Sequence, residues 1–77
     1  MTRTPVKVNA DFMDYERVLP RFVVWGDRRY AIDRVTDIRR AASQNLGVLG
    51  IRYTCLIRGK VVHLYLVDYL WYLERVG

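Results

Sequence analysis

Three short apolar runs fill the last third of the chain and constrain its fold more than any other feature. They cover residues 51–57, 61–67 and 70–76, and they are rich in β-branched and aromatic side chains. Each run is too short for an ordinary globular helix, and the turn-forming segment Arg58-Gly59-Lys60 separates the first two. Short adjacent runs of this composition are typical of antiparallel strands. The sequence therefore predicts a three-stranded meander.

Two further strands are predicted upstream of this meander. Residues 6–13 alternate between apolar and polar side chains, which is the period of a strand with one solvated face. Residues 21–25 form the next run, and Pro20 stands at its start, where a missing amide costs little. The pair Gly26-Asp27 follows this run and is typical of a hairpin turn. We therefore expect the second and third strands to be antiparallel neighbours.

The third predicted strand is irregular. The apolar positions of residues 30–40 slip by one before Val35 and Ile38, as they do at a β-bulge, so we expect one long bent strand followed by a loop. A short helix over residues 36–46 remains an alternative, because Thr36 could serve as its N-cap. The strand is favoured because the helix would have too little apolar surface to bury. Before its final residue, Leu46, it would contain one large apolar residue, Ile38.

These runs predict an all-β protein, a six-strand curled antiparallel sheet or small SH3-like barrel. A chain of 77 residues has room for one domain, residues 1–77, with an ordered core over about residues 5–76. The sequence contains no apolar run long enough to span a membrane, so membrane insertion is not expected. It also has no apolar segment after its first arginine, so secretion is not expected. The single cysteine, Cys55, cannot form an intrachain disulfide and favours a reducing, cytoplasmic location.

Arginine dominates the charge of the chain. Lys and Arg number 13 against 8 Asp and Glu, a formal net charge of +5, and eleven of the 13 are Arg. Guanidinium groups pair with phosphates and carboxylates, so nucleic acid or an acidic protein would suit this chain as a partner. A curled sheet could gather several of these charges on one rim. The alternative is that they are solvated turn and edge charges, which also deter edge-to-edge aggregation. The basic set comprises Arg28, Arg29, Arg34, Arg39, Arg40, Arg52, Arg58 and Lys60.

Ten aromatic rings are more than one small core can enclose, so some are expected at the surface or at an interface. Tyr53 and Trp71 share strand faces with apolar residues and are predicted to be core, whereas Tyr65 and Tyr72 are predicted to be exposed. The run 61–67 is apolar on both faces, and strands of that kind are buried on both. A homodimer would supply the second layer.

No catalytic, metal or cofactor signature is present. His63 has no second ligand at a recognisable spacing, and Cys55 lies inside a predicted strand as a small hydrophobe. The two could meet across a hairpin as a thiol-imidazole pair, but the sequence supplies no third group to orient them. We therefore expect no enzyme activity, no cofactor and no metal.

A family resemblance rests on the motif Pro20, Trp25 and Arg28-Arg29-Tyr30, and on the terminal run Trp71-Tyr72-Leu73-Glu74-Arg75-Val76. The chain resembles small bacterial proteins grouped as a domain of unknown function, which share a Pro…Trp-Arg-Gly-Arg-x-Tyr hairpin and end in a Trp-x-Leu-Glu-Arg-Val strand. The resemblance covers about residues 20–76. It implies a short all-β cytoplasmic domain without known catalytic activity, encoded near genes of DNA-repair polymerases.

The sequence thus predicts a noncatalytic binding module that contacts nucleic acid through an arginine-rich rim. The alternative is a protein-interaction or structural adaptor that acts through an apolar outer face of its sheet.

Overall fold

The computed structural model describes residues 4–12, 18–42, 49–68 and 70–76, and within these ranges every regular element is a strand. The predicted all-β class is confirmed, with seven strands in place of the six expected. The strands are β1 (Thr4–Phe12), β2 (Val18–Trp25), β3 (Arg28–Ala31), β4 (Arg34–Ala42), β5 (Leu49–Ile57), β6 (Lys60–Val67) and β7 (Leu70–Arg75).

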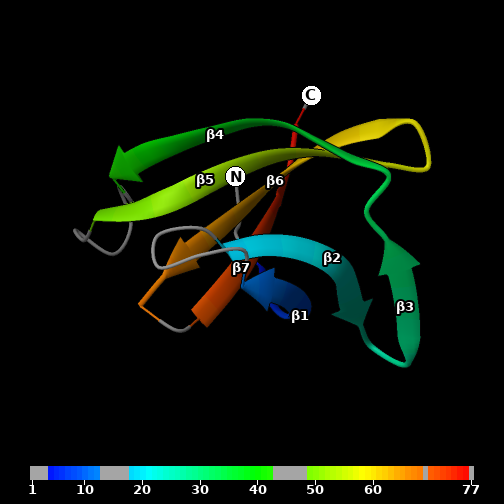
Figure 1. Cartoon of the computed structure of the whole chain (residues 1–77). Coiled ribbons are helices and arrows are strands. Elements are labelled where there is room, and N and C mark those ends of the chain that lie inside the picture. Colours follow the sequence, from blue (N-terminus) through cyan, green and yellow to red (C-terminus); the bar gives the residue numbers. More distant parts are fainter. Residues whose placement is uncertain (1–3, 13–17, 43–48, 69, 77) are drawn as a thin grey trace.

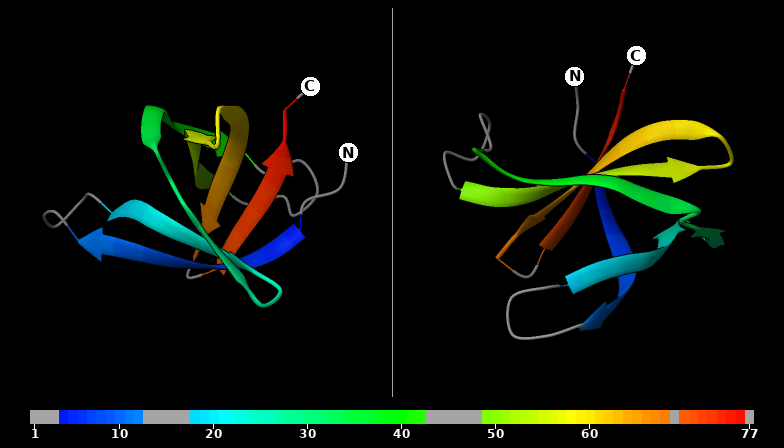
Figure 2. Two further views of the ribbon diagram at one scale, coloured as in Figure 1. Left: turned by 90° about the vertical axis from the view of Figure 1, so that its right-hand side faces the viewer. Right: turned by 45° about the horizontal axis from the view of Figure 1, so that its top comes forward.

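The strands form one antiparallel sheet in the order β3-β2-β1-β7-β6-β5-β4, which curls into a half-barrel (Figure 1, Figure 2). The first corner of this curl lies in β1. Its residues 4–6 pair with β7, whereas its residues 7–12 pair with β2. One strand therefore belongs to both halves of the sheet and turns the chain from one half to the other.

The second corner lies between β3 and β4, where we expected one long bent strand. The Ile32 N–H donates to the Arg21 carbonyl at 2.9 Å, and the next amide, that of Asp33, donates to the Leu56 carbonyl at 2.8 Å. These two acceptors belong to β2 and β5, so consecutive amides bond to different strands. The backbone consequently leaves one ladder and enters another, and the expected single strand is two.

The predicted slip in the apolar pattern is a β-bulge in β4. Val35 pairs with Cys55 and Asp37 pairs with Thr54, which leaves Thr36 as the extra residue. The Thr36 hydroxyl donates to the Thr54 carbonyl at 3.2 Å. The alternative of a helix over residues 36–46 is wrong for residues 36–42, which belong to β4, and its remaining residues lie outside the described part of the chain.

The predicted hairpins are confirmed. Trp25 pairs with Arg28 around a turn in which Gly26 has a φ of 64°. In the β5–β6 turn Arg58 and Gly59 have φ values of 52° and 76°. Positive φ at both central residues is the requirement of a type I′ turn, whose twist matches that of the strands it joins. The meander β5-β6-β7 then follows in regular register.

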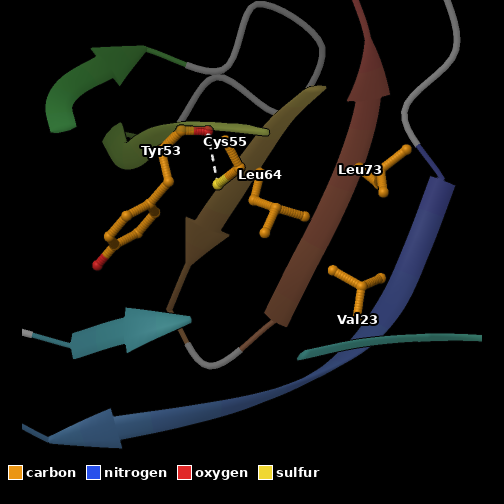
Figure 3. Close-up of a cluster of buried hydrophobic side chains, with 5 residues drawn as sticks. All are labelled: Val23, Tyr53, Cys55, Leu64 and Leu73. Atoms are coloured by element: carbon orange, nitrogen blue, oxygen red, sulfur yellow. Dashed lines mark hydrogen bonds between the residues drawn. The ribbon is translucent and has the colours of Figure 1, made fainter. Parts of the chain in front are cut away.

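The core lies inside the curl of the sheet (Figure 3). Val23, Tyr53, Cys55, Leu64 and Leu73 form it, and each exposes at most 4% of its surface. The Tyr53 ring extends from β5 toward β2, and its hydroxyl donates to the Val18 carbonyl at 2.6 Å. This bond joins two strands that are not neighbours in the sheet, so it ties the two halves of the half-barrel together.

Candidate functional site

A cleft of about 370 Å³ opens at one end of the half-barrel, and we call it the barrel-mouth cleft. The β5–β6 turn, the β2–β3 hairpin and the end of β7 surround it. Its floor is formed by Val23 and Leu73 of the core, with the partly buried side chains of Ile57 and Val62 beside them. The floor is therefore apolar and is fixed by the same packing that holds the fold.

The rim of the barrel-mouth cleft is basic. Arg58 and Lys60 approach it from the β5–β6 turn, and Arg75 approaches it from the end of β7. All three residues are exposed. No carboxylate occurs among the described residues that line the cleft. Three positive charges around an apolar floor create a local field that attracts anions.

Two aromatic rings stand among these cations. Trp25 is 38% exposed and Tyr30 is partly buried. The guanidinium carbon of Arg75 lies 5.7 Å from the centre of the Trp25 ring, and that of Arg58 lies 5.2 Å from the centre of the Tyr30 ring. Both distances are within the range of cation–π attraction. A guanidinium held over a ring keeps its N–H groups free to bind an anion.

The backbone fixes Arg58 at this position. Its φ of 52° lies in the left-handed region, which costs about 1 to 2 kcal/mol for a residue with a Cβ. The Arg58 N–H donates to the Asp33 carboxylate at 2.9 Å, so the β5–β6 turn is attached to the corner between β3 and β4. The turn that carries two of the rim cations is thus held to a neighbouring part of the sheet.

The remaining predicted cations lie elsewhere on the sheet. Arg28 is exposed and pairs with Trp25 across the β2–β3 hairpin, whereas the Arg29 guanidinium lies 3.9 Å from the centre of the Phe22 ring. The others are near β4. Arg39 and Arg52 are cross-strand partners, while the exposed Arg34 and Arg40 lie toward the two ends of β4. Of the predicted set, the structure brings only Arg58 and Lys60 to the barrel-mouth cleft.

Arg75 was missed as a candidate site residue. The sequence contained one indication of its position. Arg75 stands two positions after Leu73, and residues two apart in a strand point to the same face, so both lie on the inward face of β7. That position lies opposite Val62, another residue of the cleft.

The predictions for the aromatic residues are confirmed only in part. Tyr53 is core as expected, at 2% exposed, and Trp71 is partly buried, with its ring centre 5.4 Å from that of Tyr53. Tyr65 was expected at the surface but is 4% exposed, so that prediction is wrong. It lies between Arg52 and Tyr72 on the neighbouring strands, and Tyr72 is itself partly buried.

The conceivable thiol-imidazole pair does not form. Cys55 points into the core with no exposed surface, and burial raises the pKa of its thiol to about 12. His63 pairs with Thr54, the neighbour of Cys55, and so lies on the other face of the sheet. Its Nδ1 is 4.0 Å from a carboxylate oxygen of Glu74. Within the described ranges, no group of three or more potential metal-ligating side chains comes together.

Among the described residues, no helix has the length and apolarity that crossing a membrane requires. No family model, no curated protein and no solved structure matches the chain. The resemblance to the bacterial domain of unknown function therefore stays a prediction, and the functional argument rests on the barrel-mouth cleft.

Proposed function

We propose that this protein is a noncatalytic binding module that takes a segment of single-stranded nucleic acid at its barrel-mouth cleft. Arg58, Lys60 and Arg75 contact the phosphates, and a base lies over the apolar floor beside Trp25 and Tyr30. The observation that carries the proposal is the meeting of three cations and two rings, from separate segments of the chain, around one apolar cleft.

The size of the cleft favours a single strand over a duplex. A volume of about 370 Å³ is at the lower end of the range for small-molecule sites, which suits one nucleotide and not a double helix. Bases of a duplex are stacked and paired, whereas those of a single strand are free to stack on protein rings. Small β-barrels bind single strands in this way, through basic grooves that carry aromatic side chains.

The other arginines support this role at longer range. The chain carries a net charge of +5, which accelerates the approach of a polyanion even where a given arginine makes no contact with it. A cytoplasmic location would suit such a module, since a chain with one cysteine cannot form an intrachain disulfide.

The proposed site needs no second subunit. The homodimer was expected because the outer face of β6 is apolar, yet Tyr65 and Val67 on that face are only 4% and 5% exposed within a single chain. The dimer stays a prediction. The adaptor alternative rests on Val61, which is 42% exposed and pairs with Leu56, and on Val76, which is 44% exposed.

Fluorescence anisotropy with a labelled single-stranded oligonucleotide of about ten nucleotides tests the proposal. We expect saturable binding by the wild type, weakened at least about tenfold in the double variant Arg58→Ala/Arg75→Ala, because two charge-assisted phosphate contacts are lost. The double variant Arg39→Ala/Arg40→Ala removes the same charge from β4 and should lose less than about threefold.

Equal losses in the two double variants would show that only net charge matters and would overturn the site. Absence of oligonucleotide binding by the wild type at about 50 mM salt would overturn the function itself, because non-specific binding is strongest at low salt. The adaptor alternative would then be the better account of the chain.

A further inference from the structure

Strand β4 ends the sheet and pairs with β5 on one side only. In Figure 1 and Figure 2, β4 and β2 diverge from the corner that joins β3 to β4, so no strand of the described residues lies along the second edge of β4. The strand is also open to solvent. Arg34, Thr36, Ile38, Arg39 and Arg40 are all exposed.

The free edge is long and regular beyond its bulge. After Thr36, the pairing of β4 with β5 runs without interruption from Asp37 to Ala42. In a regular strand, every second residue directs its N–H and C=O groups away from the paired neighbour. The six residues 37–42 therefore present a row of unpaired backbone groups along the free edge. Such a row is the template that an extended peptide pairs with when it adds a strand to a sheet.

Ile38 shows where an added strand would find apolar contact. It pairs with Tyr53 of the core and shares its inward face, yet it is 48% exposed. On the inner face of this open edge, the Tyr53 side chain extends to β2, where its hydroxyl donates to the Val18 carbonyl. A strand laid beside β4 would cover Ile38 and extend the curl of the sheet.

Charge decides what kind of strand fits. Strand β4 carries three arginines, Arg34, Arg39 and Arg40, against one acid, Asp37. Asp37 is already held by Arg39 at 2.8 Å. A second copy pairing through the same edge would bring these arginines close to their own counterparts, and like charges across strands are destabilising. Carboxylates opposite them would be stabilising.

We propose that the free edge of β4 binds an extended acidic peptide segment of a partner protein as an added antiparallel or parallel strand. The segment alternates acidic residues, which meet Arg39 and Arg34 on the outer face of β4, with apolar residues, one of which covers Ile38 on the inner face. This site is separate from the barrel-mouth cleft, none of whose lining residues belongs to β4. It therefore does not depend on the proposed nucleic-acid function.

The probe is an acetylated peptide of about eight residues that alternates glutamate with valine or threonine, enough to span β4. Titration into isotopically labelled protein should shift the amide resonances of β4 and saturate below about 1 mM. Two N-methylated versions separate strand pairing from simple charge attraction. Each carries methyl groups on one alternate set of amides, and only the set that faces β4 should abolish binding, because a strand pairs through one edge.

Matched charge reversals complete the test. Arg39→Glu should weaken the peptide at least about threefold, whereas Lys7→Glu, an equal change of charge at an exposed site on β1, should alter its affinity less. No saturation, equal binding of both methylated peptides, or shifts confined to the barrel-mouth cleft would overturn the proposal. It would also be overturned if an oligonucleotide, or a second copy of the chain detected by light scattering, occupied the β4 edge in place of the peptide.

Discussion

Replacing Tyr53 by Phe tests whether one hydroxyl holds the two halves of the half-barrel together. The change removes a single oxygen and leaves the ring, which packs in the core at 2% exposed and contacts Trp71. What is lost is the 2.6 Å bond to the Val18 carbonyl, which joins β5 to β2 across the interior. Val18 is only partly buried, so water can reach part of the space around its freed carbonyl.

The expected loss follows from these features. A hydrogen bond contributes about 0.5 to 1.5 kcal/mol net, and an acceptor left partly unsatisfied adds to this, so Tyr53→Phe should lower the free energy of unfolding by about 1 to 2 kcal/mol. For a domain of this size each kcal/mol corresponds to about 4 to 8 °C in melting temperature. Thermal and urea unfolding of the variant and the wild type measure the difference.

Tyr72→Phe is the matched control for this change. Tyr72 is partly buried, and no hydrogen bond of its hydroxyl occurs among the described residues. It should lose less than about 0.5 kcal/mol, as is usual for a change away from a specific contact. If the two Tyr→Phe variants unfold at the same denaturant concentration, the Tyr53 bond does not hold the half-barrel together, and the reasoning from its geometry fails.

Two further predictions concern the core and the β5–β6 contact. Burial raises the pKa of Cys55 from 9.0 to about 12, so the folded chain keeps a proton that the unfolded chain releases. Stability should therefore fall by about 1.4 kcal/mol per pH unit as the pH rises above about 9, and urea unfolding of Cys55→Val should lack this part of the slope. A Cβ on Gly50 would lie 2.8 Å from the Leu66 carbonyl oxygen and 2.9 Å from Val67 Cγ2. Gly50→Ala should consequently cost about 1 to 3 kcal/mol, and an unchanged melting temperature would contradict that contact.

The local pattern of the sequence predicted most of the strands. The meander, the two hairpins and the bulge near Thr36 follow from features that span only a few consecutive residues. These features are the alternation of apolar and polar side chains and the turn-forming residues. The break between β3 and β4 does not follow in this way. It depends on Ile32 and Asp33 bonding to Arg21 and Leu56, and periodicity holds no information on partners so distant in sequence.

The candidate site shows the same division. Arg58 and Lys60 were predicted because they belong to the turn segment Arg58-Gly59-Lys60, which composition alone identifies, whereas Arg75 joins them only through the register of β7 on β6. Tyr65 was misplaced for a related reason. Its phase along β6 is outward, but its burial depends on the side chains of neighbouring strands, which only the register brings beside it.

The salt dependence of oligonucleotide binding tests the account of the barrel-mouth cleft most directly. For a single strand, log affinity falls with log salt at a slope of about −0.7 for each phosphate neutralised. Three contacts, from Arg58, Lys60 and Arg75, predict a slope of about −2 for the wild type, and Arg58→Ala/Arg75→Ala should reduce it to about −0.7. A wild-type slope near zero, or a slope that the double variant leaves unchanged, would contradict the claim that these three residues bind phosphates.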